Sequence, residues 1–327
     1  MEQEQITLDK NFPKTLMQAI KFFADPDVAL RFMIAIRWPE GITCPRCDSD
    51  KHSFVKTRRI WICLSCKKHF SVKLGTIMED SPIGLDKWLC GMWMICGAKN
   101  GISSYEIHRA LGITQKSAWF LLHRIRLAMQ NGTFRKLAGH VEIDETWIGG
   151  KARNMHRSVL DRKGGGNMGT FTAGKVAVMG LLERHGEVRL EVISDTQRPT
   201  LDPHIKRHVE RGTNVYTDSL ASYQHLNDAN AYMHQIVNHA IEYVRGNVHT
   251  NGIENFWSLL KRTIRGTYVA VEPFHLFRYL DEQSFRFNNR KGNDAQRFVK
   301  AAQNISDKRL TYKKLTGKEP AGYETSH

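Results

Sequence analysis

Hydrophobic positions recur along the chain with two different periods, and the change of period divides it into helical and mixed regions. Residues 14–37 carry apolar side chains at helical spacing, and residues 84–131 have the pattern of a helical bundle. Between 138 and 290, strand and helix patterns alternate, which predicts an α/β domain. The residues after Arg290 are polar and basic, so we expect a loose tail there.

Two helices joined by a short turn are predicted within residues 102–129. Ser103 followed by Glu106 forms a capping box that begins the first helix, Gly112 ends it, and Thr114 is a good N-cap for the second. This is the helix-turn-helix pattern, although an ordinary helical hairpin has the same features. The second helix offers three cations for a DNA groove or backbone: Lys116, Arg124 and Arg126.

Four of the six cysteines form two CxxC pairs separated by 15 residues. Two thiolates from one tight turn can reach the same ion, and two such turns complete the tetrahedron that Zn²⁺ prefers. We therefore predict a zinc ribbon with a structural zinc ion, the alternative being four thiols without metal. The predicted ligands are Cys44, Cys47, Cys63 and Cys66.

Two acidic residues are associated with predicted strands of the α/β region. Asp144 lies within an alternating strand pattern, and Asp218 ends a second, shorter strand that a helix follows. Acids in such positions can converge on one spot of an α/β sheet. Glu145 should point to the opposite face of its strand from Asp144, so we do not expect it to be a ligand.

A third carboxylate lies on a predicted amphipathic helix that begins near His249. Glu254 falls on the same flank as Lys261 and Arg265, beside an apolar face made by Ile253, Trp257, Leu260 and Ile264. Carboxylates bind Mg²⁺, and two such ions clamp the attacking and leaving oxygens of a phosphoryl transfer. The two cations of this flank would hold a DNA phosphate. Trp257 is expected to pack in the core.

Charge is consistent with a nucleic-acid partner. Lys and Arg outnumber Asp and Glu by 48 to 33, a formal net charge of +15. Residues 151–172 form a predicted basic loop with three consecutive glycines, which we interpret either as a surface loop or as a segment that orders on DNA through Lys151 and Arg153. The N-terminus lacks the pattern of a secretory signal, and the apolar stretch 88–98 is too short for a membrane span. We expect a cytoplasmic, nucleoid-associated bacterial protein that binds no membrane.

The spacing of the acids resembles the Asp-Asp-Glu signature of the transposase and retroviral integrase superfamily. Thirty-five residues separate Asp218 from Glu254, and Lys261 follows seven residues later. Across residues 25–290 the chain is similar to an insertion-sequence transposase branch with an N-terminal zinc ribbon. The stretches that carry this similarity are, in order, CPRC with CLSC, FSVKLGTIMEDSPIGLDKW, IDETWIGGK and HTNGIENFWSLLKR. Relatives in this branch can have Asn near the third acid, so Asn251 remains an alternative ligand to Glu254.

The resemblance implies an RNase H-like catalytic core with a mixed sheet flanked by helices. It also implies Asp144, Asp218 and Glu254 as catalytic ligands of two Mg²⁺ ions, which Mn²⁺ can replace. The implied substrates are double-stranded transposon ends and target DNA, bridged by a homodimer or larger multimer. We expect five segments: an N-terminal helical segment 1–40, a zinc ribbon 41–82, a helix-turn-helix region 83–135, the catalytic domain 136–290 and a basic tail 291–327.

Two other classes of protein compete with this interpretation. One is a zinc-ribbon and helix-turn-helix DNA-binding protein without catalysis, or an inactive transposase remnant. The other is a tyrosine recombinase, because His275 and Arg278 form an HxxR motif. Tyr279, immediately adjacent, is poorly placed as its nucleophile, and an amphipathic core helix explains these residues better. A zinc deaminase is excluded because no HxE precedes the CxxC pairs.

Overall fold

The computed structural model describes residues 12–130, 135–150, 174–226, 231–237, 248–269 and 271–318. The chain divides into two compact units. The first unit combines residues 1–130 with 292–327, and the second comprises residues 131–291. Each unit is described by itself below.

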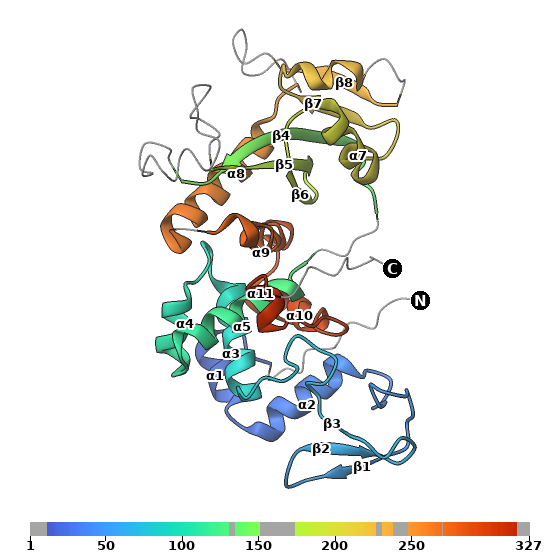
Figure 1. The fold of residues 1–327 in the computed structure, drawn as a ribbon, viewed down its shortest axis with the longest axis vertical. Helices are drawn as coiled ribbons and strands as arrows, with labels where there is room; N and C mark the ends of the chain where they lie inside the picture. The colour runs from blue at the N-terminus through green and yellow to red at the C-terminus, as the bar shows by residue number, and fades with distance from the viewer. Residues whose placement is uncertain are drawn as a thin grey trace. The chain divides into compact units, whose positions relative to one another are not determined.

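Helices make up most of the first unit (Figure 1). The predicted N-terminal helical segment is two helices, because Asp25 caps a new helix and Pro26 occupies its first position. The capping box at Ser103 and the left-handed Gly112 bound the first helix of the helix-turn-helix region as predicted. The helices are α1 (Leu16–Phe23), α2 (Pro26–Arg37), α3 (Leu85–Gly97), α4 (Ser104–Leu111) and α5 (Gln115–Ala128).

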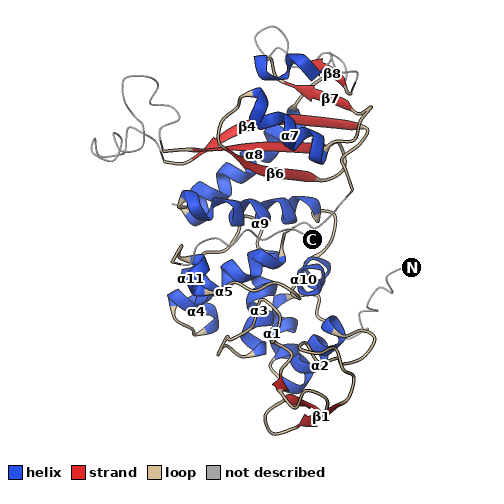
Figure 2. Cartoon of the chain, turned by 45° about the vertical axis from the view of Figure 1, so that its right-hand side comes forward, coloured by secondary structure: helices blue, strands red, loops and turns tan. Residues whose placement is uncertain are grey.

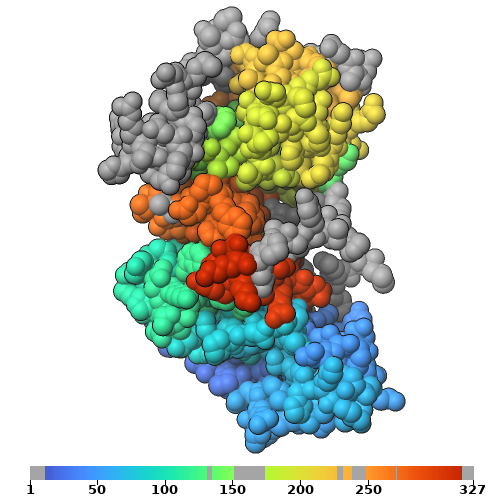
Figure 3. All heavy atoms as spheres, viewed as in Figure 1, coloured from blue at the N-terminus to red at the C-terminus, as the bar shows by residue number. Residues whose placement is uncertain are grey.

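The C-terminal segment differs from the loose tail expected from its composition. It forms α10 (Asp294–Gln303) and the short α11 (Tyr312–Leu315), and α10 packs against α3. Phe298 is fully buried and lies 5.1 Å from Trp93 and 5.5 Å from Phe32, measured between ring centroids. In Figure 3 this red segment lies directly against the cyan and green residues of the same unit. A few apolar residues spaced for one helical face are enough to anchor an otherwise polar segment.

The cysteine-containing region is a small three-stranded antiparallel sheet in the order β1-β2-β3. Its strands are β1 (His52–Val55), β2 (Ile60–Cys63) and β3 (His69–Phe70). Trp61 is buried and stacks on Phe70, with ring centroids 5.6 Å apart. This sheet has little apolar core of its own, so a metal ion is the natural means of stabilising it.

A five-stranded mixed sheet forms the centre of the second unit, in the order β6-β5-β4-β7-β8 (Figure 2). The strand β5 pairs antiparallel with both neighbours, whereas β4, β7 and β8 run parallel to one another. The strands are β4 (His140–Ile148), β5 (Val176–Glu183), β6 (Val188–Ile193), β7 (Asn214–Thr217) and β8 (Met233–Ile236). The mixed sheet flanked by helices confirms the predicted RNase H-like α/β class.

Helices cover both faces of this sheet, and alternation along β4 assigns each side chain to a face. Val141 and Ile143 pack in one core with α7 (Arg198–His208) and the 3₁₀ helix η2 (Ala221–Leu226). Ile148 packs in the other core with α8 (Asn251–Thr263) and α9 (Leu276–Asn288). A π-helical turn, η3 (Ile264–Tyr268), extends α8, and a 3₁₀ turn, η4 (Pro273–His275), precedes α9.

The apolar stretch of the first unit is a buried helix, as its flanking charges predict. The helix α3 has 13 residues, of which eight are buried. Among the residues that the structure describes, no helix is both long and apolar enough to cross a membrane.

Candidate zinc and active sites

The four predicted zinc ligands come together in the first unit. Their sulfur atoms all lie within 4.8 Å of one another. Cys44 Sγ lies 3.8 Å from Cys66 Sγ, and Cys47 Sγ lies 3.6 Å from Cys63 Sγ. Four thiolates about 2.3 Å from a central zinc ion would be about 3.8 Å apart, so the cluster has the dimensions of a tetrahedral site. Backbone hydrogen bonds, first from Cys66, lower the pKa of Cys63 to about 6, which favours the thiolate that binds metal.

The acidic site of the second unit lies where two parallel strands separate. Pairing between β4 and β7 joins residues 140–142 to 214–216 and goes no further. Asp144 lies on β4 just beyond the last pair, and Asp218 directly follows β7. The backbone N–H of Leu220 donates to Asp218 Oδ1 at 3.0 Å, which fixes the turn after the strand.

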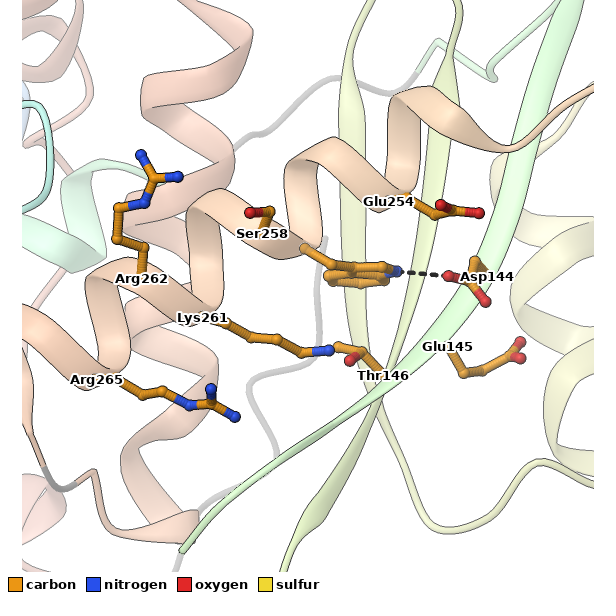
Figure 4. A pocket seen from close by; sticks show the side chains of 9 residues that line it. Asp144, Glu145, Thr146, Glu254, Ser258, Lys261, Arg262 and Arg265 are labelled. Atoms are coloured by element: carbon orange, nitrogen blue, oxygen red, sulfur yellow. Dashed lines mark hydrogen bonds between the residues drawn. The ribbon is translucent and has the colours of Figure 1, made fainter. Parts of the chain in front are cut away.

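A cavity of about 580 Å³ opens between β4 and α8. Figure 4 shows carboxylates at one end, from Asp144, Glu145 and Glu254, and cationic side chains extending from the C-terminal part of α8 at the other. The lining residues are Asp144, Glu145, Thr146, Glu254, Trp257, Ser258, Lys261, Arg262 and Arg265. The predicted flank of Glu254, Lys261 and Arg265 therefore faces one cavity.

Burial and the repulsion of neighbouring carboxylates raise the pKa values of the two acids on β4, Asp144 and Glu145. Burial, together with the charges of Asp218 and Glu254, raises the pKa of Asp144 to about 6. Burial and the charges of Asp144 and Asp218 raise the pKa of Glu145 to about 8. The charge of Asp218 contributes to both shifts, although Asp218 does not line the cavity.

This donor set fits a hard divalent cation. The acids supply oxygen ligands only, and burial disfavours the ionised forms of Asp144 and Glu145 in the absence of a compensating positive charge. The three predicted ligands do not form a cluster as tight as the cysteines, whose ligand atoms all lie within 4.8 Å.

Glu254 and Asn251 differ in their relation to the cavity. The helix α8 begins at Asn251, so both residues lie in its first two turns. Both side chains are exposed, but Glu254 lines the cavity and accepts a hydrogen bond from the Thr250 hydroxyl at 3.0 Å, whereas Asn251 does not line it.

Three residues of the acidic site were missed from sequence. Glu145 lines the cavity although strand alternation assigned it to the far face, because β7 has left the edge of β4 at this point. Trp257, expected to pack, also donates its indole N–H to Asp144 Oδ2 at 2.9 Å. Glu142 is buried beside Arg184 on the same face as Asp144, a placement that the two-residue strand period could have indicated.

The predicted DNA contacts of the helix-turn-helix region are only partly on the surface. Lys116 is exposed near the start of α5. Arg124 and Arg126 are 5% and 1% exposed, and Arg124 donates to the backbone oxygens of Glu79 and Leu310. This burial contradicts the expectation that both arginines reach DNA, and Arg124 instead links α5 to the backbone at Glu79 and Leu310. The predicted contacts Lys151 and Arg153 lie outside the described residues.

A second cluster of possible metal ligands lies on the opposite face of the sheet. Glu191 of β6 is close to His204 and His208 of α7. His208 Nε2 lies 2.7 Å from Glu191 Oε1, and the Arg189 guanidinium lies 3.5 Å from His208 Nδ1. Both Glu191 and Arg189 belong to β6, so the two contacts join the imidazole of α7 to the same strand. We therefore interpret this cluster as a hydrogen-bonded link between α7 and β6.

The tyrosine recombinase alternative has no support in the geometry. Tyr279 is 9% exposed and packs in the core beneath α8, and Arg278 is equally buried. A nucleophile must reach a phosphate, which this tyrosine cannot do from the core.

Comparison with known proteins assigns the chain to a family. Residues 136–288 match the ISXO2-like transposase domain, and residues 25–69 match the transposase zinc-ribbon domain. An uncharacterized protein in transposable element ISH50 of Halobacterium salinarum is 25% identical over 254 residues, covering 75% of this chain and 85% of that protein. An uncharacterized transposase-like protein of Haemophilus influenzae is 35% identical over 98 residues, covering 30% of this chain and 78% of that protein. The chain belongs to the ISXO2-like transposases that carry an N-terminal zinc ribbon.

Proposed function

We propose that this transposase cleaves DNA at the terminal inverted repeats of its insertion sequence and transfers the freed 3′ ends to target DNA. The observation that carries this proposal is the cavity in which Asp144 and Glu254 face Lys261 and Arg265. A cluster of acids next to a row of cations suits a reaction between metal-bound oxygen and a phosphate. The family assignment independently supports DNA transposition.

Asp144, Asp218 and Glu254 are the proposed ligands of two Mg²⁺ ions, for which Mn²⁺ would substitute. When bound, such ions lower the pKa of a water or 3′-hydroxyl nucleophile and stabilise the leaving oxygen. The three carboxylates come from the strand β4, the turn directly after β7 and the helix α8, so tertiary packing positions them before the phosphate arrives.

The cations of α8 and η3 are proposed to hold the DNA backbone. Arg265 and Arg262 are exposed, and Lys261 is half-buried against the cavity. Burial, together with the charge of Arg265, lowers the pKa of Lys261. A phosphate group in the cavity would offset the repulsion between Lys261 and Arg265, because its oxygens can accept hydrogen bonds from both cations.

The segments of the first unit are proposed to bind DNA without cleaving it. The zinc ribbon 41–82 and the helix-turn-helix region 83–135 carry exposed cations, including Lys56, Lys68 and Lys116. We propose that they recognise the transposon end while the domain 136–290 cleaves it. A dimer or larger multimer would bring two ends together.

Cleavage of labelled DNA that carries the element's own ends tests the proposal. The wild-type protein should nick these ends only with Mg²⁺ or Mn²⁺. Asp144→Asn and Asp218→Asn should each lower the rate more than about 100-fold, since outer-sphere partners alone often change activity 10–100-fold. Retention of end binding by both variants, measured by fluorescence anisotropy, would assign the loss to chemistry.

Glu210→Gln is the matched control, because Glu210 is an exposed acid of the same unit outside the cavity. It should cleave like the wild type. Tight end binding without cleavage under either metal would instead favour the DNA-binding protein or inactive remnant. Cleavage by Asp218→Asn at the wild-type rate would remove that residue from the ligand set.

A further inference from the structure

Two hydrogen bonds tie the start of α8 to β4, one on each side of Glu254. The backbone N–H of Ile253 donates to Glu142 Oε2 at 2.9 Å, and the indole N–H of Trp257 donates to Asp144 Oδ2 at 2.9 Å. We propose that Glu142 and Trp257 are positioning residues that fix the separation of Glu254 and Asp144. This inference rests on the proposed function, in which those two carboxylates bind metal.

Glu142 caps α8 from a neighbouring strand. The first backbone N–H groups of a helix lack partners within it, and a carboxylate there is further stabilised by the helix dipole. Thr250 occupies the N-cap position but makes no side-chain capping bond, and its hydroxyl donates to Glu254 instead. The carboxylate of Glu142, only 1% exposed, takes over the capping role at Ile253.

The carboxylate of Glu142 is itself fixed from the other side. Arg184 Nε donates to Glu142 Oε1 at 2.7 Å, and His249 Nδ1 lies 3.3 Å from the same oxygen. Arg184 also donates to the His249 carbonyl at 2.7 Å and lies over the Tyr216 ring at 4.2 Å. Oε1 of Glu142 therefore pairs with Arg184, while Oε2 accepts the hydrogen bond from the first turn of α8. The ion pair also fixes the chain where it enters α8.

Two glycines allow the helix to approach the sheet this closely. A Cβ at Gly252 would lie 2.8 Å from Glu142 Oε2, and a Cβ at Gly180 would lie 2.6 Å from the Trp257 ring. Gly180 is paired with Asp144 across β4 and β5, so the missing side chain leaves room for the indole beside that carboxylate. Both glycines thus serve the same close contact.

The Trp257 bond also restrains the orientation of the Asp144 carboxylate. The indole N–H donates to Oδ2, and this bond opposes rotation of the carboxylate about its Cβ–Cγ bond. Hydrogen bonds of this kind hold a metal ligand in its binding orientation. Removing such a bond typically lowers metal affinity or activity by about 10–100-fold. Since Trp257 and Glu254 are on the same helix, the Trp257 hydrogen bond orients the Asp144 carboxylate and also fixes the position of Glu254 relative to it.

Mn²⁺ binding to the full-length, zinc-loaded protein tests the role of Trp257. Trp257→Phe keeps an aromatic ring in the core and removes the N–H donor. Its dissociation constant for Mn²⁺, measured by electron paramagnetic resonance of the free ion, should rise about tenfold or more. Phe287→Leu is the matched control, because Phe287 packs against the same core without a bond to either carboxylate. Equal Mn²⁺ affinity in Trp257→Phe and wild type would overturn the assignment.

Hydrogen exchange tests Glu142 without reference to metal or activity. Glu142→Gln retains an oxygen for Ile253 but removes the charge that pairs with Arg184. Backbone amides of residues 252–256 should exchange about tenfold faster, the effect of weakening a charged hydrogen bond by about 1.4 kcal/mol. Amides of α9 should be unchanged.

The two experiments separate the failure of this inference from failure of the proposed function. A wild-type protein that binds no Mn²⁺ at the acids would refute the proposed function. Unchanged exchange over residues 252–256 in Glu142→Gln would refute the positioning role, whatever the metal does.

Discussion

The two candidate metal sites of this transposase differ in how far apart their ligands lie in the chain. The cysteines fall between residues 44 and 66 and come from two turns of one small sheet. The acids fall between residues 144 and 254 and come from the strand β4, the turn after β7 and the helix α8. A site built from neighbouring residues depends on local turns, whereas a site built across a domain depends on sheet pairing and helix docking.

The two sites also differ in their effect on folding. Between residues 44 and 70 the buried side chains are only Cys44, Trp61, Cys63 and Phe70, so zinc binding contributes directly to the stability of this part of the ribbon. The acidic cavity instead lowers the stability of the metal-free protein. Burial raises the pKa of Asp144 and Glu145, so ionised carboxylates there are unfavourable without a cation. We therefore expect removal of a cysteine to unfold a region, and removal of an acid to leave the fold intact.

The largest expected effect is at the ribbon. Cys63→Ser should abolish zinc binding and unfold residues 41–82, because structural zinc contributes about 10–16 kcal/mol in small zinc domains. Zinc content and hydrogen exchange over β1 and β2 measure this. Cys90→Ala, at a buried cysteine of α3 outside the cluster, should retain a full zinc equivalent. A Cys63→Ser protein with native exchange in β2 would show that the ribbon folds without its metal.

A smaller effect is expected at the basic side of the acidic cavity. Lys261→Ala and Arg265→Ala should each reduce the salt dependence of DNA binding, with the slope falling by about 0.9 for each phosphate that the protein no longer neutralises. The slope is measured from anisotropy titrations at several salt concentrations. Arg207→Ala is the control, since Arg207 is an exposed cation of α7 on the opposite face of the sheet. An equal change in all three variants would indicate general charge attraction without specific binding at the cavity.

The smallest expected effect is the pH dependence of stability that comes from Glu191, whose pKa is lowered whereas that of Asp144 is raised. Burial opposes ionisation of Glu191, but the hydrogen bond and charge of His208 outweigh it and lower its pKa. A lowered carboxyl pKa contributes stability above the unfolded value of about 4.3, and this contribution disappears as pH falls through the folded value. Glu191→Gln should therefore lower the free energy of unfolding by about 1 kcal/mol near pH 6.

The same variant provides its own control at acid pH. Once wild-type Glu191 is protonated, the difference between the proteins in urea unfolding of the second unit should approach zero. A difference that is constant with pH would mean that Glu191 acts through packing and not through its charge.

Local features of the fold were predictable because they depend on neighbouring residues. The caps at Ser103 and Thr114, the left-handed Gly112 and the cysteine knuckles all follow from interactions within a few residues. Burial was harder to predict. Arg124 has the sequence pattern of a DNA contact on α5, yet it donates to backbone oxygens of residues 79 and 310, which no local pattern reveals.

By itself, the sequence determined the cysteine cluster, the ends of the main helices, the α/β character of residues 138–290 and the flank shared by Glu254 and Lys261. Only the tertiary structure decided that Glu145 borders the cavity, that Trp257 bonds to Asp144 and that α10 belongs to the first unit. The physical reason is the range of the interactions. Caps and knuckles close over a few residues, whereas the acidic site forms only when β4 separates from β7 and α8 docks over Gly180.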